Sequence, residues 1–467
     1  MKNLILIISA LIISYSLNAQ STFEKVINRG YGQLGSVIQT ADGGFAAMGE
    51  FNVNRPDKWL VRTDAMGDTI WTRVFPGIGS GQYGDRYFYE TPDGGFTFLS
   101  GWPNKTSLVH VDANGQTIWN KELYTGTANA MSQTPGGCII TGQESDTMFN
   151  TKLTVCKVSD NGDIIWKRNY SPHPSTSGIS PHPKAIRETK EGGYIVAGNM
   201  YNFYFINIPF LFRIGPAGDS LWYQEYNYFG DQTIHSVDTT MDGGFIACGN
   251  MNANNRGFVM KVDQAGDSLW TYIFFLQSGR YLASIITTED SGAVVCGGTS
   301  ILFQSIDSNK VFLVKFSAGG NIEWERFIGT FGDSYGDCIE HTQDNGYIIC
   351  GGVIPYGTPT KYNGILIKTD GNGNMTGIEN HFAEADTRFY PNPASDYTNL
   401  SLPANNSGLP AKIKLYDLLC QLAKTVDMPI NQAIYQLDIT DLHPGIYMTI
   451  IEINDKSAGR AKLVVKR

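Results

Sequence analysis

A short polar pattern, Thr-x-(Asp/Glu)-Gly-Gly-aromatic or a close variant of it, occurs seven times along this chain. The second glycine of each copy is, in order, Gly44, Gly95, Gly137, Gly193, Gly244, Gly292 and Gly346. The copies lie 42 to 56 residues apart, and a period in this range with strand-like flanks is typical of β-propeller blades. We therefore predict an all-β chain whose main domain is a seven-bladed β-propeller.

Each repeat carries a second mark downstream of its glycine pair: an Asp-x-x-Gly-Asp turn or a relative of it, then an aliphatic residue and a tryptophan. These marks span residues 64–71, 112–119, 159–166, 215–222, 263–270 and 317–324. Six of the eight tryptophans lie there, and their identical placement indicates wedges between neighbouring blades rather than platforms for sugars. Four runs of strand composition per repeat, which we name strands a to d, complete the pattern; in the first repeat they are residues 37–40, 45–49, 58–63 and 69–75.

The two ends of the repeat region are out of phase with each other. Residues 23–27 resemble a d strand, whereas the last repeat ends in the turn 370–374 with no tryptophan and no d strand behind it. We expect residues 23–27 to complete the seventh blade, so that the first and last blades join without an open edge.

This strand order sorts the connections by face. The short a–b and c–d turns share one side, here called the uniform rim, and the b–c and d–a loops, whose lengths differ, share the other, here called the variable rim. Because variable loops on a regular scaffold commonly carry binding, we expect a glycan or a surface protein to be bound at the variable rim.

Aromatic residues of three loops are the candidate binding residues, since tyrosine provides amphipathic contact at a low entropic cost. They are Tyr201, Phe203, Tyr204 and Phe205 in the b–c loop of repeat 4, Tyr226, Tyr228 and Phe229 in the next d–a loop, and Tyr356 and Tyr362 in repeat 7. The alternative interpretation is that these rings cover one another as small loop cores.

Carboxylates near the ends of the a strands support a second functional hypothesis, an extracellular polysaccharide hydrolase or lyase. The weak catalytic candidates are Glu90, Glu188, Asp238, Glu340 and His341. Glycoside hydrolysis requires paired carboxylates, and these could line the central channel. They occupy no common repeat position, however, and no G-x-S-x-G, H-E-x-x-H or P-loop motif accompanies them. We therefore favour a non-enzymatic protein.

The net charge and the types of residue present argue against nucleic-acid-binding proteins and metalloproteins. The chain carries 35 Lys and Arg against 44 Asp and Glu, a net charge of −9, which disfavours a nucleic-acid partner. Each acidic turn offers two carboxylates where calcium wants six to eight oxygens. His173 and His182 have no evident third metal ligand, and no C-x-x-C is present, so we expect neither metal nor cofactor.

The seven cysteines show a repeat pattern of their own. Cys248, Cys296 and Cys350 share one position, four residues after the second glycine, which indicates small buried side chains in separate blades. Two disulfides remain open alternatives, Cys338 with Cys350 and Cys138 with Cys156.

The first 19 residues have the character of a signal peptide, with Lys2, the apolar run 4–13 and the ending Leu17-Asn18-Ala19. The apolar run is too short to span a bilayer, and no later run is apolar for eighteen residues. The absence of any cysteine before Cys138 leaves no site for lipidation near the cleavage point. We expect a mature protein without a transmembrane anchor.

The periodicity stops after Asn380, and a different set of motifs begins. These are Phe-Tyr-Pro-Asn-Pro-Ala at 389–394, a run at 412–419 ending Tyr-Asp-Leu-Leu, Asp-Leu-His-Pro-Gly-Ile-Tyr at 441–447, and Lys-Leu-Val-Val-Lys at 462–466. Together they resemble the type A C-terminal sorting domain of the type IX secretion system; Cys420, where the family usually has glycine, is a departure. The resemblance implies a small antiparallel β-sandwich that interacts with the secretion machinery and directs export across the outer membrane.

The domain organisation that follows is a signal peptide at 1–19, a propeller at 20–378, a linker at 379–388 and a sorting domain at 389–467. The propeller repeats are also similar to those of large surface proteins of such bacteria, a likeness that transfers no catalytic residue. The predicted protein is therefore secreted or attached to the cell surface after passing through the periplasm.

Overall fold

The chain forms two compact units, Met1–Glu379 and Asn380–Arg467. The computed structural model describes residues 21–28, 32–51, 57–76, 86–101, 105–145, 151–171, 180–201, 206–226, 230–251, 256–274, 279–300, 309–329, 332–355 and 362–375 of the first unit and residues 389–401, 411–417, 421–428, 434–453 and 456–466 of the second. The expected signal peptide and linker lie outside these residues. Within the described ranges, no helix has the length and apolar character to cross a membrane.

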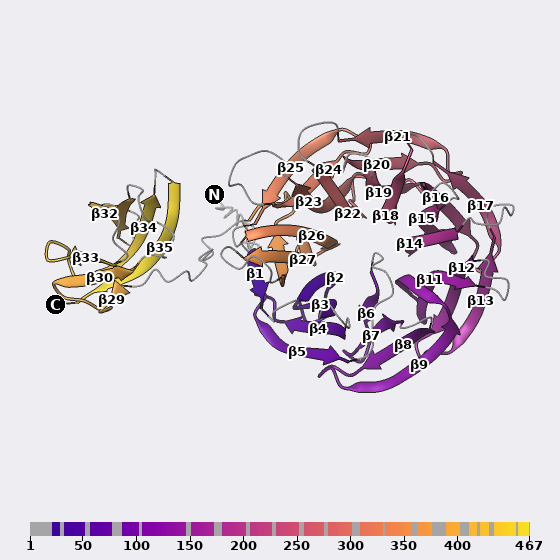
Figure 1. Ribbon diagram of the computed structural model, residues 1–467, viewed down its shortest axis with the longest axis horizontal. Coiled ribbons are helices and arrows are strands. Elements are labelled where there is room, and N and C mark those ends of the chain that lie inside the picture. Colours follow the sequence, from indigo (N-terminus) through magenta and orange to yellow (C-terminus); the bar gives the residue numbers. More distant parts are fainter. Residues whose placement is uncertain are drawn as a thin grey trace, which may run out of the picture. The chain divides into compact units, whose positions relative to one another are not determined.

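The first unit contains seven four-stranded antiparallel sheets, which are the blades of a β-propeller arranged around a centre (Figure 1). Blades 1 to 3 are β2 (Gly32–Gln39), β3 (Phe45–Phe51), β4 (Asp57–Thr63) and β5 (Thr69–Phe75); β6 (Phe88–Glu90), β7 (Phe96–Ser100), β8 (Lys105–Val111) and β9 (Thr117–Thr125); and β10 (Thr127–Thr134), β11 (Gly137–Ser145), β12 (Thr151–Ser159) and β13 (Ile164–Tyr170). Blades 4 to 6 are β14 (Ser180–Glu188), β15 (Tyr194–Tyr201), β16 (Asn207–Ile214) and β17 (Ser220–Glu225); β18 (Gln232–Thr239), β19 (Phe245–Met251), β20 (Arg256–Val262) and β21 (Ser268–Ile273); and β22 (Gly279–Thr287), β23 (Ala293–Ser300), β24 (Val311–Phe316) and β25 (Ile322–Ile328). The first strand of each of these blades is the innermost, so strand a lines the centre and strand d the circumference (Figure 1).

Blade 7 is built from both ends of the propeller sequence. It contains β26 (Gly332–His341), β27 (Tyr347–Pro355), β28 (Asn363–Thr369) and, as its outer strand, β1 (Phe23–Ile27). β1 pairs with β28 in an antiparallel register that places Phe23 opposite Lys368 and Ile27 opposite Gly364. The strand predicted from residues 23–27 thus occupies the position of the missing d strand.

The turns of the uniform rim explain both glycines of the repeat. In the first copy, the Gly43 amide donates to the Thr40 carbonyl at 2.9 Å, and Gly43 has a φ of +85°. Glycine adopts this left-handed region without a steric cost, and Ser291 and Asn345 occupy it in blades 6 and 7. A Cβ on Gly44, by contrast, would overlap the carbonyl oxygen of Thr63. The first glycine thus provides the left-handed backbone conformation of the turn, and the second allows the close approach of strand c.

Substitution of a second glycine should therefore be destabilising. We expect Gly346→Ala to cost about 1–3 kcal/mol of unfolding free energy, because its Cβ would overlap the Thr369 carbonyl oxygen. Asn345→Gly in the same turn is the matched control, since Asn345 already has a φ of +61°, and it should change stability by less than about 0.5 kcal/mol. Denaturant unfolding monitored by tryptophan fluorescence measures both, and equal stabilities would contradict this account.

The tryptophans are wedges between blades, as predicted. An added Cβ at Gly266, in the c–d turn of blade 5, would lie 3.1 Å from the ring of Trp222 in blade 4, and the Trp222 indole donates to the Gln264 carbonyl of the same turn at 3.0 Å. The same glycine–ring contact recurs around the propeller: Gly115 with Trp71, Gly162 with Trp119, Gly218 with Trp166, Gly320 with Trp270, and Gly373 with Trp324. Gly67 meets Phe23 in this way, so β1 contributes the corresponding ring for blade 7.

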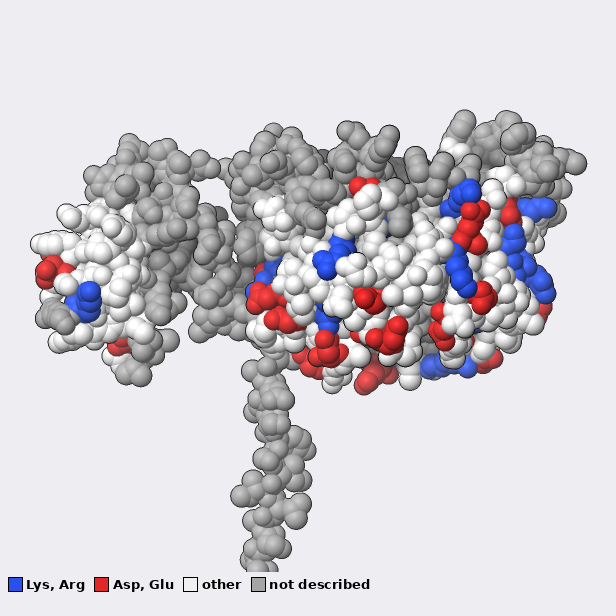
Figure 2. Space-filling model, turned by 90° about the horizontal axis from the view of Figure 1, so that it is seen from below, with Lys and Arg blue, Asp and Glu red and all other residues white. Residues whose placement is uncertain are grey.

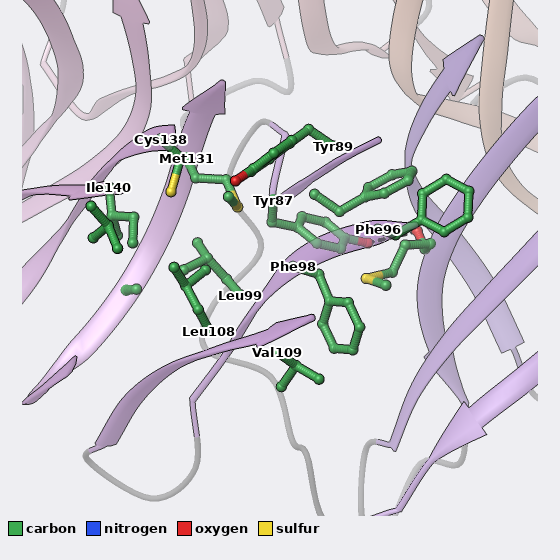
Figure 3. Close-up of a cluster of buried hydrophobic side chains, with 14 of the residues drawn as sticks. Tyr87, Tyr89, Phe96, Phe98, Leu99, Leu108, Val109, Met131, Cys138 and Ile140 are labelled. Atoms are coloured by element: carbon green, nitrogen blue, oxygen red, sulfur yellow. Dashed lines mark hydrogen bonds between the residues drawn. The ribbon is translucent and has the colours of Figure 1, made fainter. Parts of the chain in front are cut away.

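The hydrophobic core lies between neighbouring blades. Figure 3 shows one such cluster, which includes both faces of blade 2. Phe98 packs on Phe75 of blade 1 with ring centroids 5.0 Å apart, whereas Tyr89 lies beside Met131 and Cys138 of blade 3. All five side chains are at most 6% exposed. Each blade is thus stabilised mainly by burying its faces against its neighbours.

The second unit is a pair of antiparallel sheets. One contains β29 (Phe389–Tyr390), β30 (Tyr397–Ser401) and β33 (Ile434–Asp438), and the other β32 (Leu422–Met428), β31 (Ala411–Tyr416), β34 (Gly445–Ile453) and β35 (Lys456–Val465). Their shared core includes Phe389, Leu415 and Leu463. The Asn392 side chain accepts the Val464 amide at 2.9 Å, so the Pro-Asn-Pro motif holds the last strand. Cys420 lies outside the described residues.

Candidate ligand-binding site on the variable rim

A cavity of about 310 Å³ lies between blades 4 and 5. Its lining side chains come from β14, β15 and β16 of blade 4 and from β18 of blade 5: His182, Lys184, Asn199, Tyr201, Asn207, Thr233 and His235. They belong to the strand ends or strand halves that connect to b–c and d–a loops, so the cavity is on the variable rim. We name it the blade 4–5 pocket.

A bulge in the inner strand places two of these residues. The β14–β15 register shifts between Pro183 and Ala185, which leaves Lys184 unpaired, and the β18–β19 register shifts between Ile234 and Ser236, which leaves His235 unpaired. A residue left out of the ladder in this way re-aims its side chain. Lys184 and His235 therefore occupy the same repeat position in adjacent blades.

The pocket is lined by weakly hydrated basic groups. Burial lowers the pKa of His235 to about 4, with a further contribution from the charge of Lys184. Burial and the same lysine also lower the pKa of His182, and burial lowers the pKa of Lys184 itself. Both imidazoles are therefore neutral at pH 7, each with one N–H to donate.

Hydrogen bonds hold the walls of the pocket. The Asn199 side chain accepts the Ile234 amide at 2.8 Å, which ties blade 4 to blade 5. Asn207 donates from its side chain to Asp231 at 2.9 Å. The ring of Tyr201 lies edge-to-face with His182, with centroids 6.1 Å apart. These contacts pre-form the pocket, as is usual for ligand sites.

Of the predicted aromatic residues, Tyr201 is in this pocket and Tyr226 is not available to a ligand. Tyr226 is 3% exposed, and its hydroxyl donates to the Gly266 carbonyl at 2.8 Å. It lies four residues after Trp222, the position that buried Phe75 and Phe274 occupy after their own tryptophans. The placement of Tyr226 among rim contacts is thus corrected to a core position, and the repeat contained the signal.

Of the seven remaining aromatic candidates, one is described and six are not. Tyr362 is 42% exposed and packs edge-to-face on Tyr335, whose hydroxyl donates to the Gln33 side chain at 2.7 Å. This contact joins blades 7 and 1. Tyr204, Phe205, Tyr228 and Tyr356, with Phe203 and Phe229 beside them, lie outside the described residues.

The predicted channel carboxylates mostly serve as contacts between blades. Glu90 accepts the Ala41 amide at 2.7 Å, and Asp238 accepts the amide and hydroxyl of Thr287 at 2.9 and 3.1 Å. Glu340 forms an ion pair with Arg86. Each of these three carboxylates therefore has a partner in another blade.

The other two channel candidates differ from each other. His341 Nε2 lies 2.7 Å from the Thr287 carbonyl oxygen of blade 6, so it too links blades. Glu188 is half-buried at the end of β14, and its charge raises the pKa of Tyr194 in addition to the effect of burial on that hydroxyl.

Asp337 occupies the bulge of blade 7, between Gly336 and Cys338. Desolvation raises its pKa to about 7, from about 3.9 in an unfolded chain. The folded state therefore binds a proton that the unfolded state has released between about pH 4 and pH 7, and stability falls as the pH rises through that window. Asp337→Asn should raise stability by about 2–4 kcal/mol at pH 8 and leave it unchanged at pH 4. Thermal melts at the two pH values measure this, and an equal gain at both would contradict it.

The acidic turns of the uniform rim are occupied by backbone groups and by lysine or arginine. Asp64 accepts the amides of Met66 and Asp68 at 2.9 Å each, and Asp68 pairs with Lys25 of β1 at 2.9 Å. Among the described residues no group of three or more His, Cys, Asp or Glu side chains has the geometry of a metal site. Figure 2 shows Asp and Glu gathered along one edge of the described propeller surface.

The described cysteines of the propeller are buried free thiols. Cys338 lies directly opposite Cys350 in the β26–β27 register, and both are free, as are Cys138 and Cys156. Cys248 and Cys296 are fully buried, as their repeat position predicted.

The second unit matches a known family. The family model described as "Secretion system C-terminal sorting domain" covers residues 388–466. This unit is a type IX sorting domain. The domain marks the protein for export to the cell surface or the extracellular space, and it implies an interaction with the secretion machinery.

The propeller has similar solved structures, while the search of curated proteins returns no match. A protein of unknown function from Dyadobacter fermentans is 12% identical over 74% of this chain and 97% of its own, with a TM-score of 0.43. The β-propeller domain of the trilobed protease from Pyrococcus furiosus is 9% identical over 74% and 98%, with a TM-score of 0.42. Polysaccharide lyase Uly1 is 9% identical over 72% and 90%, with a TM-score of 0.48. The sorting domain and the seven blades described above identify a secreted protein with a β-propeller fold.

Proposed function

We propose that this secreted β-propeller is a binding protein that recognises a glycan or another surface protein through the blade 4–5 pocket, without catalysing a reaction. The observation that supports the proposal most is the lining of that pocket: an aromatic ring, two neutral imidazoles, a hydroxyl and a lysine converge on about 310 Å³. A mostly pre-formed cavity with a few convergent polar groups is the usual form of a ligand site.

The hydrolase or lyase alternative has less support. General acid–base chemistry needs carboxylates within reach of one substrate bond, whereas Glu90, Asp238 and Glu340 are engaged with donors of other blades. The lining residues that the structure describes include no carboxylate.

Binding and turnover can be measured on the same samples. The mature protein, purified from the medium, is applied to a panel of polysaccharides and surface proteins, and released oligosaccharides are quantified in parallel. We expect binding without product, a loss of affinity of about tenfold in Tyr201→Ala, and no loss in Tyr362→Ala, which changes the rim at blade 7. Product formation would support the hydrolase or lyase hypothesis. Equal affinities of the two variants would show that the ligand does not bind in the blade 4–5 pocket.

A further inference from the structure

Lys184 differs from the buried lysines on the c strands of the propeller, which have carboxylate partners. Lys261, Lys315 and Lys368, each on a c strand, pair with an aspartate of the glycine turn at 2.5–2.6 Å. Lys184 is only half-buried, yet in the part of the chain that the structure describes it has no ion pair or hydrogen bond, and burial is the one influence on its pKa. An ammonium group partly removed from water without a counterion is energetically costly, so the pocket is prepared for a negative charge.

The groups around Lys184 can donate hydrogen bonds to the same anion. His182 is two residues away on β14, and His235 faces it from β18 of blade 5. The Thr233 hydroxyl lies 3.2 Å from His235 Nε2, which orients that ring. None of the described lining residues is a carboxylate, although the whole chain has a net charge of −9. Lys184 is thus the charged group of the described lining, and the Asp231 carboxylate is bound to the lining residue Asn207.

Tyr201 adds an apolar face to this anion site. Its ring is half-buried at the end of β15 and is held by its edge-to-face contact with His182. A ring beside a cluster of donors suits a pyranose that carries an acidic group, since the ring covers the C–H face and the donors meet the charge. A volume of about 310 Å³ admits one or two such units.

We propose that the blade 4–5 pocket binds a negatively charged sugar unit of an acidic polysaccharide, with the acidic group at Lys184 and the sugar ring against Tyr201. This inference rests on the proposed binding function and names its ligand class. A carboxylate and a sulfate share the required chemistry, so both kinds of acidic sugar are tested.

The affinity for such a ligand should depend on pH. His182 and His235 are neutral at pH 7, and an anion beside them favours their protonated forms, so binding takes up a proton. The other charged or titratable groups at the site are Lys184, Tyr201, the Asp231 carboxylate that holds Asn207, and Tyr281, whose ring lies 5.4 Å from that of His235. We expect affinity to rise as the pH falls from 8 to 5.5, while the acidic sugar stays ionised.

The test compares three oligosaccharide probes by calorimetry with the mature full-length protein: oligogalacturonate, sulfated dextran oligomers and neutral dextran oligomers. We expect an acidic probe to bind, the neutral one to bind at least tenfold more weakly, and Lys184→Gln to lower the acidic affinity about tenfold or more. Lys190→Gln is the matched control, since Lys190 lies on the same blade at the uniform rim, and it should bind as the wild type does. Thermal melts establish that each variant is folded.

The two levels of the proposal fail differently. Equal binding of acidic and neutral probes, or an unchanged affinity in Lys184→Gln, overturns the acidic-sugar inference. The binding function survives that result if Tyr201→Ala still weakens binding of a neutral glycan or of a surface protein. Absence of any Tyr201-dependent binding on the whole panel overturns both.

Discussion

Deletion of residues 20–29 from the mature protein should lower its thermal unfolding midpoint by about 10 °C or more. The deletion removes β1, whose Phe23 is fully buried and whose Ile27 is 7% exposed. Burial of two such side chains contributes about 5 kcal/mol, and the backbone pairs with β28 are lost as well. The outer edge of blade 7 would then be unpaired, which also favours association between molecules.

Two point variants separate the ring contact from the strand pairing. Phe23→Ala removes the ring that meets Gly67 of blade 1 and should account for about 3–5 kcal/mol of the loss. Lys25→Ala, which removes the exposed pair with Asp68, should cost less than about 1 kcal/mol. Differential scanning calorimetry measures all three proteins. A deletion variant that melts like the wild type would show that β1 does not join blade 7 to the first blade.

Deletion of residues 389–467 should abolish export and retain the propeller in the periplasm. The deletion removes both sheets of the sorting domain, which is the part of the chain that implies contact with the secretion machinery. Immunoblots of medium, cell surface and periplasm measure the outcome, with Lys184→Gln as a control that should be exported normally. Truncated protein in the medium at the wild-type level would contradict the assignment of export to this domain.

The repeat predicted the architecture because its residues answer local backbone requirements. The left-handed position at Gly43 and the close approach of Gly44 to Thr63 each restrict the residue type. The second glycine is therefore present in all seven copies, and the first position is glycine, serine or asparagine. The wedge role of the tryptophans could be predicted for the same reason: one ring and one glycine recur at a constant spacing.

The pocket could not be predicted as readily as the blades. Its lining residues differ from one repeat to the next, because the backbone of the blade does not require a particular residue type at these positions. The bulges that place Lys184 and His235 depend on the pairing of β14 with β15 and of β18 with β19. Their common position, five residues before the threonine of the glycine turn, is a signal that the repeat contains. The prediction that Tyr226 lies on the rim is wrong because its distance from Trp222, and not the adjoining loop, determines its position in the core. The sequence indicates where the channel carboxylates lie along the chain but not what they contact. Their partners Ala41, Thr287 and Arg86 belong to other blades and are distant in the sequence.

The ring-and-glycine contact also bears on how such a chain could have grown. Each repeat supplies one aromatic ring on its d strand and one glycine in its c–d turn, and the ring of one blade packs on the glycine of the next. A duplication of a single repeat in the gene would therefore copy both halves of the joint at once, and the new blade would meet each neighbour through a contact that already existed. Phe23 takes the place of tryptophan in the contact between blade 7 and blade 1, where the two ends of the propeller sequence meet. A repeat added elsewhere would leave this contact between Phe23 and Gly67 unchanged.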